Sequence, residues 1–299
     1  DTMRYTFFLE QMTIVSKPLL FVGASGTAKS LITASYLKNL DSGKFMSLEM
    51  NFSSRTSSMD VQNTIEANVE KRSGSTYGPP VGKKLVVFID DLNMPVVDTY
   101  GTQQPVALLK FLVERGNLYD RGDDERERLQ KKTFQDFRYI AAMAPPGGGR
   151  NDTDPRFAAL FNTFSITFPE NDSLELIYSS IIKAHGAQFN ESIQGAFDRL
   201  TPAMLKLYNE IVVRLPATPS KFHYVFNLRD LSRVYEGMLL STPEKFTTTT
   251  SVVRLWRNEV LRVFHDRLIS EEDQGIVKNE ILGKLIKDTF GGEAKDALA

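Results

Sequence analysis

A short segment with two glycines, VGASGTAKSL at residues 22–31, carries the residue types that bind phosphate. The spacing of Gly23, Lys29 and Ser30 fits the pattern G-x-x-x-x-G-K-[ST], except that Ala28 stands where the pattern has its second glycine. In such a loop, backbone N–H groups at a helix N-terminus point at phosphate oxygens, the lysine adds positive charge, and the serine hydroxyl ligates Mg²⁺. The segment therefore predicts a nucleotide-binding loop, and the alternative is an exposed turn.

A second motif ends in two adjacent carboxylates. The segment LVVFIDD, residues 85–91, runs from apolar residues into Asp90 and Asp91. The carboxyl end of a parallel strand is where ligands bind in open α/β sheets, so we expect Asp90 to hold Mg²⁺ directly or through water. Asp91 would then orient or deprotonate an attacking water. The alternative is that the two aspartates only end a strand and begin a turn.

Strands and helices that could position these motifs alternate over the first half of the chain. Apolar runs predict strands at residues 17–22, 47–53, 84–91 and 161–169, and a further strand that begins at Phe137 and runs into a Pro/Gly loop. Helical spacing predicts helices at residues 28–40, 58–72 (with Ser58 as N-cap) and 105–116. We expect a turn-rich connector at 74–84 and an exposed turn or hairpin edge at 121–132. This alternation predicts a parallel sheet flanked by helices.

The pattern changes after Pro169 to helical periodicity alone. Helix-like segments follow at residues 173–189, 201–215, 228–240 and 251–269, with TTTT at 247–250 expected as a loop. One apolar stripe is expected to face the core, and it comprises Val253, Trp256, Val260, Phe264 and Leu268. The sequence thus predicts an α/β domain at residues 1–169 and a smaller all-α domain at residues 170–299.

The composition of the chain excludes several classes of partner and of functional site. The chain has 299 residues, 41% hydrophobic and 24% charged, with a net charge of -1, so neither nucleic acid nor a membrane is an expected partner. It has no cysteine, which excludes disulfides and thiol chemistry, and we do not expect its three separated histidines, His185, His223 and His265, to bind metal. The start, DTMRYTFF, is neither an initiator methionine nor a signal peptide, so we expect a segment of a longer chain.

The two motifs ahead of a helical domain resemble AAA+ P-loop NTPases, a family whose loop often has alanine where Ala28 stands and in which Gly26 takes the inner glycine role. Longer segments narrow this resemblance to dynein heavy chains, most closely the third AAA+ module of an axonemal chain. The segments that carry it are NFSSRTSSMDVQ (51–62), DDLNMPVVDTYGTQQP (90–105), DPRFAALFNTF (154–164), TPSKFHYVFNLRDLSRV (218–234) and LWRNEVLRVFHDRLISEED (255–273).

The resemblance implies ATP or ADP with Mg²⁺ as cofactors. The implied nucleotide-binding residues are Gly23, Ala24, Ser25, Gly26, Thr27, Ala28, Lys29, Ser30, Leu31 and Asp90, with Ser30 and Asp90 on the metal. Asp91 matches the catalytic carboxylate, where most active modules carry glutamate. Arg156 matches an arginine finger that points into the neighbouring module, and Arg229 matches the second sensor in the lid. The alternative for both arginines is a surface salt bridge.

One position departs from the family's pattern. Ala144 stands at the end of the fourth core strand, where such modules usually have a polar residue that contacts the attacking water. With Asp91 in place of glutamate, this predicts nucleotide binding with slow or mainly regulatory hydrolysis. A rival hypothesis is a structural ring module that holds ADP permanently or has an empty site. Another is a different AAA+ remodelling ATPase, which would need an exposed aromatic pore loop that residues 51–62 do not offer.

Partners and location follow from the same resemblance. It implies contacts with neighbouring AAA+ modules and the linker of the same heavy chain, and with other dynein chains. Microtubules would be reached through a distant stalk and not through this segment. The implied location is the cytoplasm and cytoskeleton, in the axoneme of a cilium or flagellum.

Overall fold

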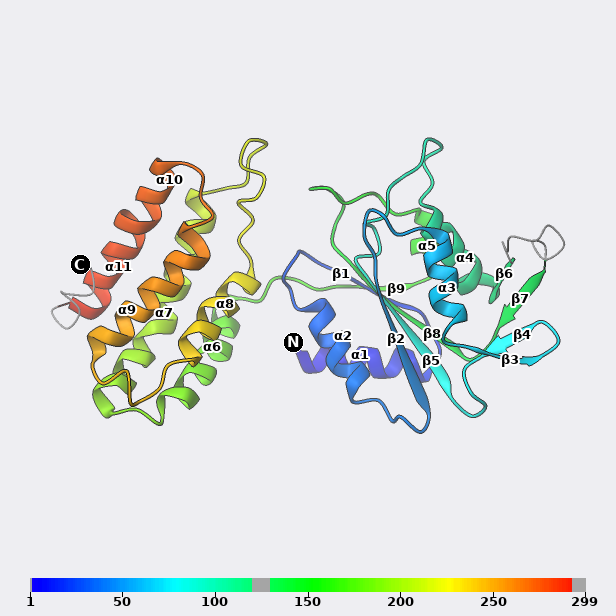
Figure 1. Cartoon of the computed structure of the whole chain (residues 1–299), viewed down its shortest axis with the longest axis horizontal. Coiled ribbons are helices and arrows are strands. Elements are labelled where there is room, and N and C mark those ends of the chain that lie inside the picture. The colour runs from blue at the N-terminus through cyan, green and yellow to red at the C-terminus, as the bar shows by residue number, and fades with distance from the viewer. Residues whose placement is uncertain (1, 120–129, 292–299) are drawn as a thin grey trace. The chain divides into compact units, whose positions relative to one another are not determined.

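The computed structural model describes residues 2–119 and 130–291 and divides the chain into two units, Asp1–Phe168 and Pro169–Ala299 (Figure 1). Within the described residues, no helix has both the length and the apolar character needed to cross a bilayer. Each unit has its own hydrophobic core, so each is described by itself.

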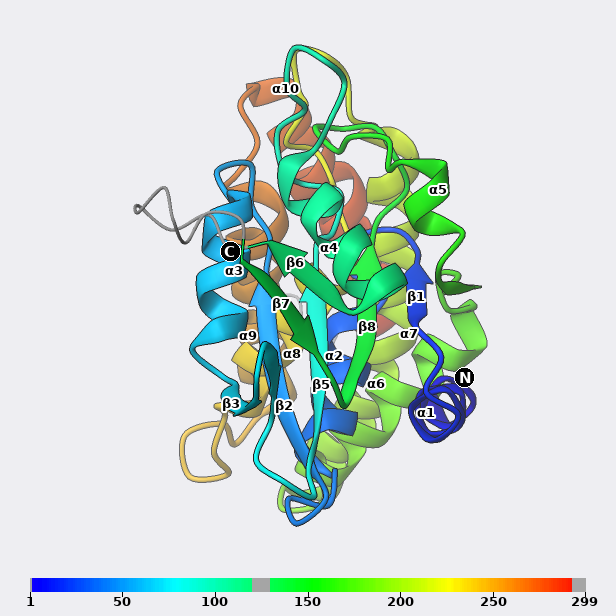
Figure 2. The ribbon, with the colours of Figure 1, turned by 90° about the vertical axis from the view of Figure 1, so that its right-hand side faces the viewer.

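A five-stranded parallel sheet forms the centre of the first unit. Its order is β2-β5-β8-β1-β9, and every neighbouring pair is parallel. The strands are β1 (Leu19–Val22), β2 (Phe45–Asn51), β5 (Lys84–Asp90), β8 (Phe137–Met143) and β9 (Asn162–Ser165). Figure 2 shows β2, β5 and β8 side by side. The expected parallel sheet is confirmed, and β5 is buried on both faces, as its continuous apolar run requires.

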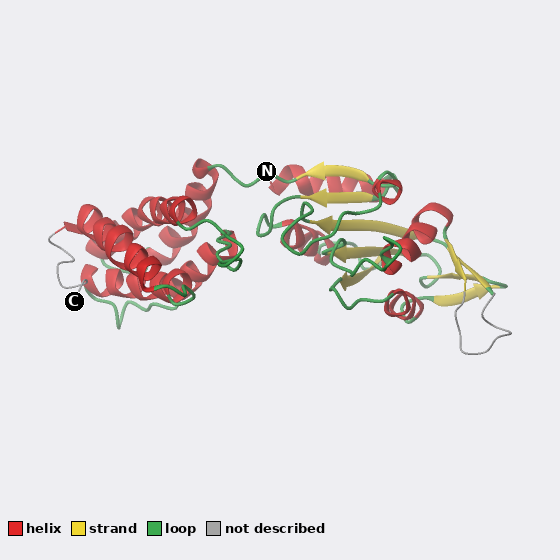
Figure 3. Cartoon of the chain, turned by 90° about the horizontal axis from the view of Figure 1, so that it is seen from above, coloured by secondary structure: helices red, strands yellow, loops and turns green. Residues whose placement is uncertain are grey.

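Helices cover both faces of this sheet (Figure 3). On one face lie α3 (Ser58–Glu66) and α4 (Gln104–Arg115), whose apolar side chains join one core cluster. On the other face lie α1 (Thr2–Ile14) and α2 (Lys29–Lys38), which contribute to a second cluster. The sequence pattern missed α1, because Leu9 is the only apolar residue of this helix that is fully buried.

A small second sheet corrects two expectations. Its order is β3-β4-β7-β6, from β3 (Glu70–Ser73), β4 (Thr76–Gly78), β7 (Lys131–Phe134) and β6 (Asn117–Tyr119). The helix expected over residues 58–72 therefore ends at Glu66, and the connector expected at 74–84 contains β4. The physical reason is long-range pairing: β4 is held by β7, and the Arg72 Nη1 lies 2.6 Å from the Asp136 Oδ2.

Two local details also differ from expectation. The N-cap of α3 is Ser57 and not Ser58, because the Ser57 hydroxyl accepts from the Asp60 N–H while the Asp60 carboxylate accepts from the Ser57 N–H. The segment 121–132, expected as an exposed turn or hairpin edge, lies outside the described residues except for its end, where Lys131 begins β7.

Among the described residues of the second unit, every named element is a helix, as expected, although one of them begins at Glu191, ten residues before the helix expected at 201–215. The elements of this unit are α6 (Asn171–Gly186), α7 (Glu191–Arg214), α8 (Leu228–Leu239), α9 (Thr249–Val260), the π-helix η1 (Leu261–His265), α10 (Glu271–Gly275), the π-helix η2 (Ile276–Leu282) and α11 (Gly283–Phe290). The predicted stripe that includes Trp256 is buried along its whole length. The TTTT tract, expected as a loop, is a loop only in its first half, since Thr248 caps α9 and the helix begins at Thr249.

Candidate functional site

The loop between β1 and α2 carries the predicted phosphate-binding residues. Gly26 and Ala28 both adopt left-handed backbone angles, with φ of 83° and 64°, and α2 begins directly after Ala28. No side chain caps this helix, so its first N–H groups are available to an anion. Gly23 lies against the Ile166 carbonyl so closely that a Cβ would collide with it. The loop thus has the backbone geometry of a phosphate cradle.

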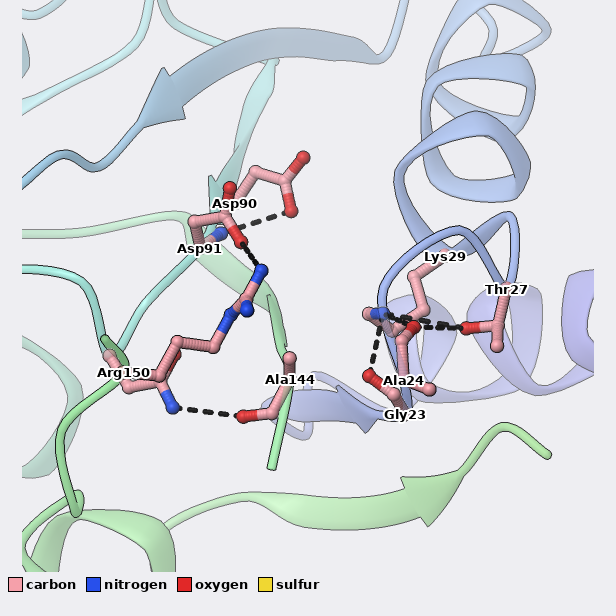
Figure 4. A network of polar contacts seen from close by, with 9 residues as sticks. Gly23, Ala24, Thr27, Lys29, Asp90, Asp91, Ala144 and Arg150 are labelled. Atoms are coloured by element: carbon pink, nitrogen blue, oxygen red, sulfur yellow. Dashed lines mark hydrogen bonds and ion pairs between the residues drawn. The ribbon is translucent and has the colours of Figure 1, made fainter. Parts of the chain in front are cut away.

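Lys29 lies folded against this loop (Figure 4). Only 8% of its surface is exposed, and its Nζ donates to the carbonyls of Gly23 and Ala24, each at 2.8 Å. It also lies 3.4 Å from the Thr27 hydroxyl, which donates to the Ala24 carbonyl. Burial lowers the pKa of Lys29. A phosphate oxygen would satisfy the same ammonium donors that now serve two backbone carbonyls.

The remaining loop residues have varied exposure. Ser30 is half-buried in the first turn of α2, where a hydroxyl can reach a metal ion next to a phosphate. Ser25 is half-buried, while Ala24 is exposed and Leu31 is 71% exposed. Leu31 therefore offers apolar surface at the start of α2.

Asp90 and Asp91 lie across from the Lys29 loop (Figure 4). Asp90 is the last residue of β5, and its carboxylate accepts from the Asp91 N–H at 3.0 Å. The negative charges of Asp90 and Asp91 both oppose the lowering of the Lys29 pKa. The strand order explains this proximity, because only β8 separates β5 from β1. The two sequence motifs therefore form one site with cationic and anionic sides.

Ala144 follows β8 at the same edge of the sheet. Its methyl group offers no hydrogen bond, and its carbonyl accepts from the buried Asn93 Nδ2 at 2.8 Å. Asn93 belongs to the loop that follows Asp91, so this bond joins the loops after β5 and β8. Sequence reasoning did not single out Asn93, since its role depends on the meeting of two distant loops.

Arg150 is a second residue that sequence reasoning missed. Its Nη2 lies 3.9 Å from the Asp91 Oδ1, and its positive charge contributes to the lowered pKa of Lys29. The signal in the sequence is the run GGGR directly after the fourth core strand, which indicates a sharp turn with a cation at its end.

Arg156 belongs to the first unit but not to this cluster, and Arg229 belongs to the second unit. Arg156 is exposed in α5 (Pro155–Ala158) and lines a cavity of about 1000 Å³ beside α4. Its backbone N–H donates to the Asp154 carboxylate, which pairs with Lys110 at 3.0 Å. Arg229 is an exposed residue in the first turn of α8 in the second unit, and its N–H donates to the Asn227 Oδ1.

Comparison with known proteins gives two family matches and several relatives. Residues 1–169 match the family described as P-loop containing dynein motor region, and residues 200–298 match the AAA+ lid domain. The chain is 56% identical over 290 residues to Dynein axonemal heavy chain 10 of Homo sapiens, which covers 97% of this chain and 6% of that protein. It is 52% identical over 301 residues to Dynein-1-alpha heavy chain, flagellar inner arm I1 complex, of Chlamydomonas reinhardtii, which covers 100% of this chain and 6% of that protein. It is 42% identical over 299 residues to Dynein axonemal heavy chain 12 of Rattus norvegicus, covering 97% of this chain and 9% of that protein.

Proposed function

The chain belongs to the dynein heavy-chain family, an AAA+ ATPase family, and from this we propose that it is an ATP-binding module of an axonemal dynein motor. One observation carries the proposal: the buried Lys29 ammonium lies at the N-terminus of α2, facing the Asp90 and Asp91 carboxylates. We propose residues 1–169 as the nucleotide-binding subdomain and residues 170–299 as the lid. The chain spans about 6% of the length of its two most identical relatives named above, so the activity of the whole motor is part of the proposal.

The residues present fit a nucleotide with Mg²⁺. The free N–H groups at the start of α2 and the Lys29 ammonium suit phosphate oxygens. The Ser30 hydroxyl and the Asp90 carboxylate are oxygen donors of the kind that Mg²⁺ prefers. When bound, Mg²⁺ neutralises negative charge on the phosphates. The loop from Gly23 to Leu31 would bind and orient the nucleotide.

We propose that hydrolysis at this site is slow and mainly regulatory. Asp91 would hold the attacking water, but its side chain is one methylene shorter than glutamate and has Arg150 within 3.9 Å. A general base displaced by about 1 Å loses on the order of 10²-fold in rate. The Ala144 side chain has no polar group, so it cannot make the hydrogen bond to the attacking water that a polar residue at this position would make. Arg229 would contact the nucleotide from the lid, and Arg156 would act on the nucleotide of the next module.

The finer assignment is also a proposal. We place the chain as the third AAA+ module of the ring, in contact with neighbouring modules and the linker of the same heavy chain and with other dynein chains. Microtubules would be bound through a distant stalk. The axonemal and flagellar names of the relatives support a location in the cytoskeleton of a cilium or flagellum.

Nucleotide titration of the chain tests this function. Lys29→Ala removes the ammonium and should weaken Mg-ATP binding by at least about tenfold, since a hydrogen bond to a charged group contributes about 1.5–3 kcal/mol. Lys38→Ala, at the exposed end of the same helix, is the matched control and should leave affinity unchanged. Tight ATP binding combined with turnover as fast as that of a fully active AAA+ module would contradict the regulatory role.

The same titration distinguishes the structural alternative. A chain that purifies with ADP that Mg-ATP does not displace would be a structural module with a permanent ligand. A chain that binds neither nucleotide would be a structural module with an empty site. Exchange of ADP for ATP supports the proposed function.

A further inference from the structure

The loop after β8 contains a well-defined turn at residues 147–150. Gly147, Gly148 and Gly149 have φ of 114°, 60° and 87°, angles that residues with a side chain rarely adopt. Two backbone hydrogen bonds close the turn, from Gly147 N to Arg150 O at 3.0 Å and from Arg150 N to Gly147 O at 3.2 Å. The three glycines reverse the chain and bring Arg150 back to the sheet edge at which Ala144 follows β8.

The turn is fastened to the loop that carries Asp91. The Asn151 N–H donates to the Asn93 carbonyl at 3.1 Å, and the Asn151 Nδ2 donates to the Pro95 carbonyl at 2.8 Å. The Asn93 Nδ2 in turn donates to the Ala144 carbonyl. These three bonds fix the backbone of Arg150 relative to both Asp91 and Ala144.

The Arg150 guanidinium has donors that the described residues leave unused. Its side chain is only 25% exposed, and its Nε is buried without a hydrogen-bond partner in the described part of the chain. The contact with Asp91 at 3.9 Å is an ion pair longer than a hydrogen bond. Buried polar groups in proteins are nearly always hydrogen-bonded, so the planar donor set of Arg150 is unusual.

The N–H donors of the Arg150 guanidinium lie next to the candidate phosphate-binding site. The charge of Arg150 acts on Lys29, and Figure 4 shows its guanidinium directed toward Asp91, across from the loop that holds Lys29. A guanidinium matches phosphate oxygens with two parallel hydrogen bonds, which a carboxylate at 3.9 Å does not provide.

We propose that Arg150 binds the terminal phosphate of ATP within its own chain and so replaces the polar contact that Ala144 cannot make. This inference rests on the proposed nucleotide-binding function. With ADP, which lacks the terminal phosphate, Arg150 stays beside Asp91. With ATP, it turns from Asp91 to the phosphate. Arg150 thereby makes the site selective for ATP over ADP.

Titration of the 299-residue chain with two nucleotides tests this inference. The probes are a non-hydrolysable Mg-ATP analogue and Mg-ADP, and one chain suffices because Arg150 and Lys29 are in the same chain. Arg150→Ala should raise the Kd for the ATP analogue by about 10- to 100-fold, the range for a lost hydrogen bond to a charged group. The Kd for ADP should change by no more than about 2-fold, within the scatter of surface substitutions. Arg150→Lys, which keeps the charge but loses the planar fork, should give an intermediate loss for the ATP analogue only.

Arg115→Ala is the matched control. Arg115 forms a comparable ion pair with Glu114 at 3.8 Å, but it is 60% exposed at the far end of α4. It should change neither Kd. Thermal unfolding without nucleotide shows whether each variant is folded. If Arg150→Ala does not fold, Arg150→Lys still allows the Kd for the ATP analogue to be compared with the Kd for ADP.

Equal weakening of ATP-analogue and ADP binding, or no change in either, would overturn the role of Arg150 while leaving nucleotide binding intact. Failure of the unmodified chain to bind either nucleotide would overturn the proposed function, and this inference with it.

Discussion

At the scale of single residues, the phosphate-binding loop contains backbone strain that the sequence pattern alone does not reveal. Ala28 replaces the glycine of the usual pattern, and the structure gives it φ 64°, a conformation that favours glycine. Asp91 has φ 51°, but aspartate tolerates the left-handed region better than alanine does. The strain therefore lies mainly at Ala28.

Ala28→Gly should stabilise the chain. The left-handed conformation costs a non-glycine residue roughly 1–2 kcal/mol, and glycine loses about 0.5–1 kcal/mol more entropy on folding, so the net gain is about 0.5–1 kcal/mol. Denaturant unfolding measures this difference. Ala24→Gly, in the same loop but with a negative φ, is the control and should not stabilise the chain. A loss of stability for Ala28→Gly would show that the left-handed backbone at this position is not strained.

At the scale of elements, hydrophobic periodicity in the sequence predicted the strands and helices whose buried face repeats at a regular spacing. The buried run in β5 and the stripe through Trp256 were predictable, because each repeats the spacing of one buried face. The β3–β4 hairpin was not, since β4 gains its stability from β7, more than 50 residues away in the chain. For the same reason, Lys29 and Asp90 could be predicted from motifs, whereas Arg150 required the conformation of a glycine turn.

A buried carboxylate joins elements of the second unit. Asp273 in α10 accepts from the Lys221 Nζ and from the Tyr224 hydroxyl at 2.8 Å. Burial alone would raise the pKa of Asp273, but these hydrogen bonds, with one from Ser270, outweigh it and hold the pKa below its usual 3.8. The contacts therefore favour the charged form of Asp273.

This gives a pH dependence with a definite sign. A carboxylate whose pKa is lowered by folding contributes stability above its unfolded pKa and loses it as the pH falls through the folded value. The chain should therefore lose stability on acidification below about pH 4, and Asp273→Asn should reduce that loss while lowering stability at pH 7. Acid unfolding followed by circular dichroism measures both effects. Asp288→Asn, an exposed position on α11, should retain the acid dependence of the unmodified chain.

At the scale of the whole molecule, the proposed site divides its arginines between two nucleotides. In the two proposals above, Arg150 would bind the nucleotide of its own chain, while Arg156 would act on that of a neighbour. Arg156 is exposed, and among the described residues its guanidinium forms no ion pair within 4 Å. It lines the cavity beside α4 instead of the cluster around Lys29.

Arg156→Ala should therefore leave ATP binding by this chain unchanged, within about 2-fold, the usual scatter of a surface substitution. Titration of the variant beside Arg150→Ala makes the comparison direct. A tenfold or greater loss of ATP affinity in Arg156→Ala would show that this arginine acts on its own nucleotide, against the proposed role as a finger.

The stripe on α9 has a practical consequence for measuring the stability of the second unit. Trp256 is the only tryptophan among the 299 residues, and it lies 1% exposed in the core of the second unit. Indole emission therefore originates in that unit alone, with no contribution from the phosphate-binding unit. The natural sequence thus supplies a spectroscopic reporter that follows the second unit without any label.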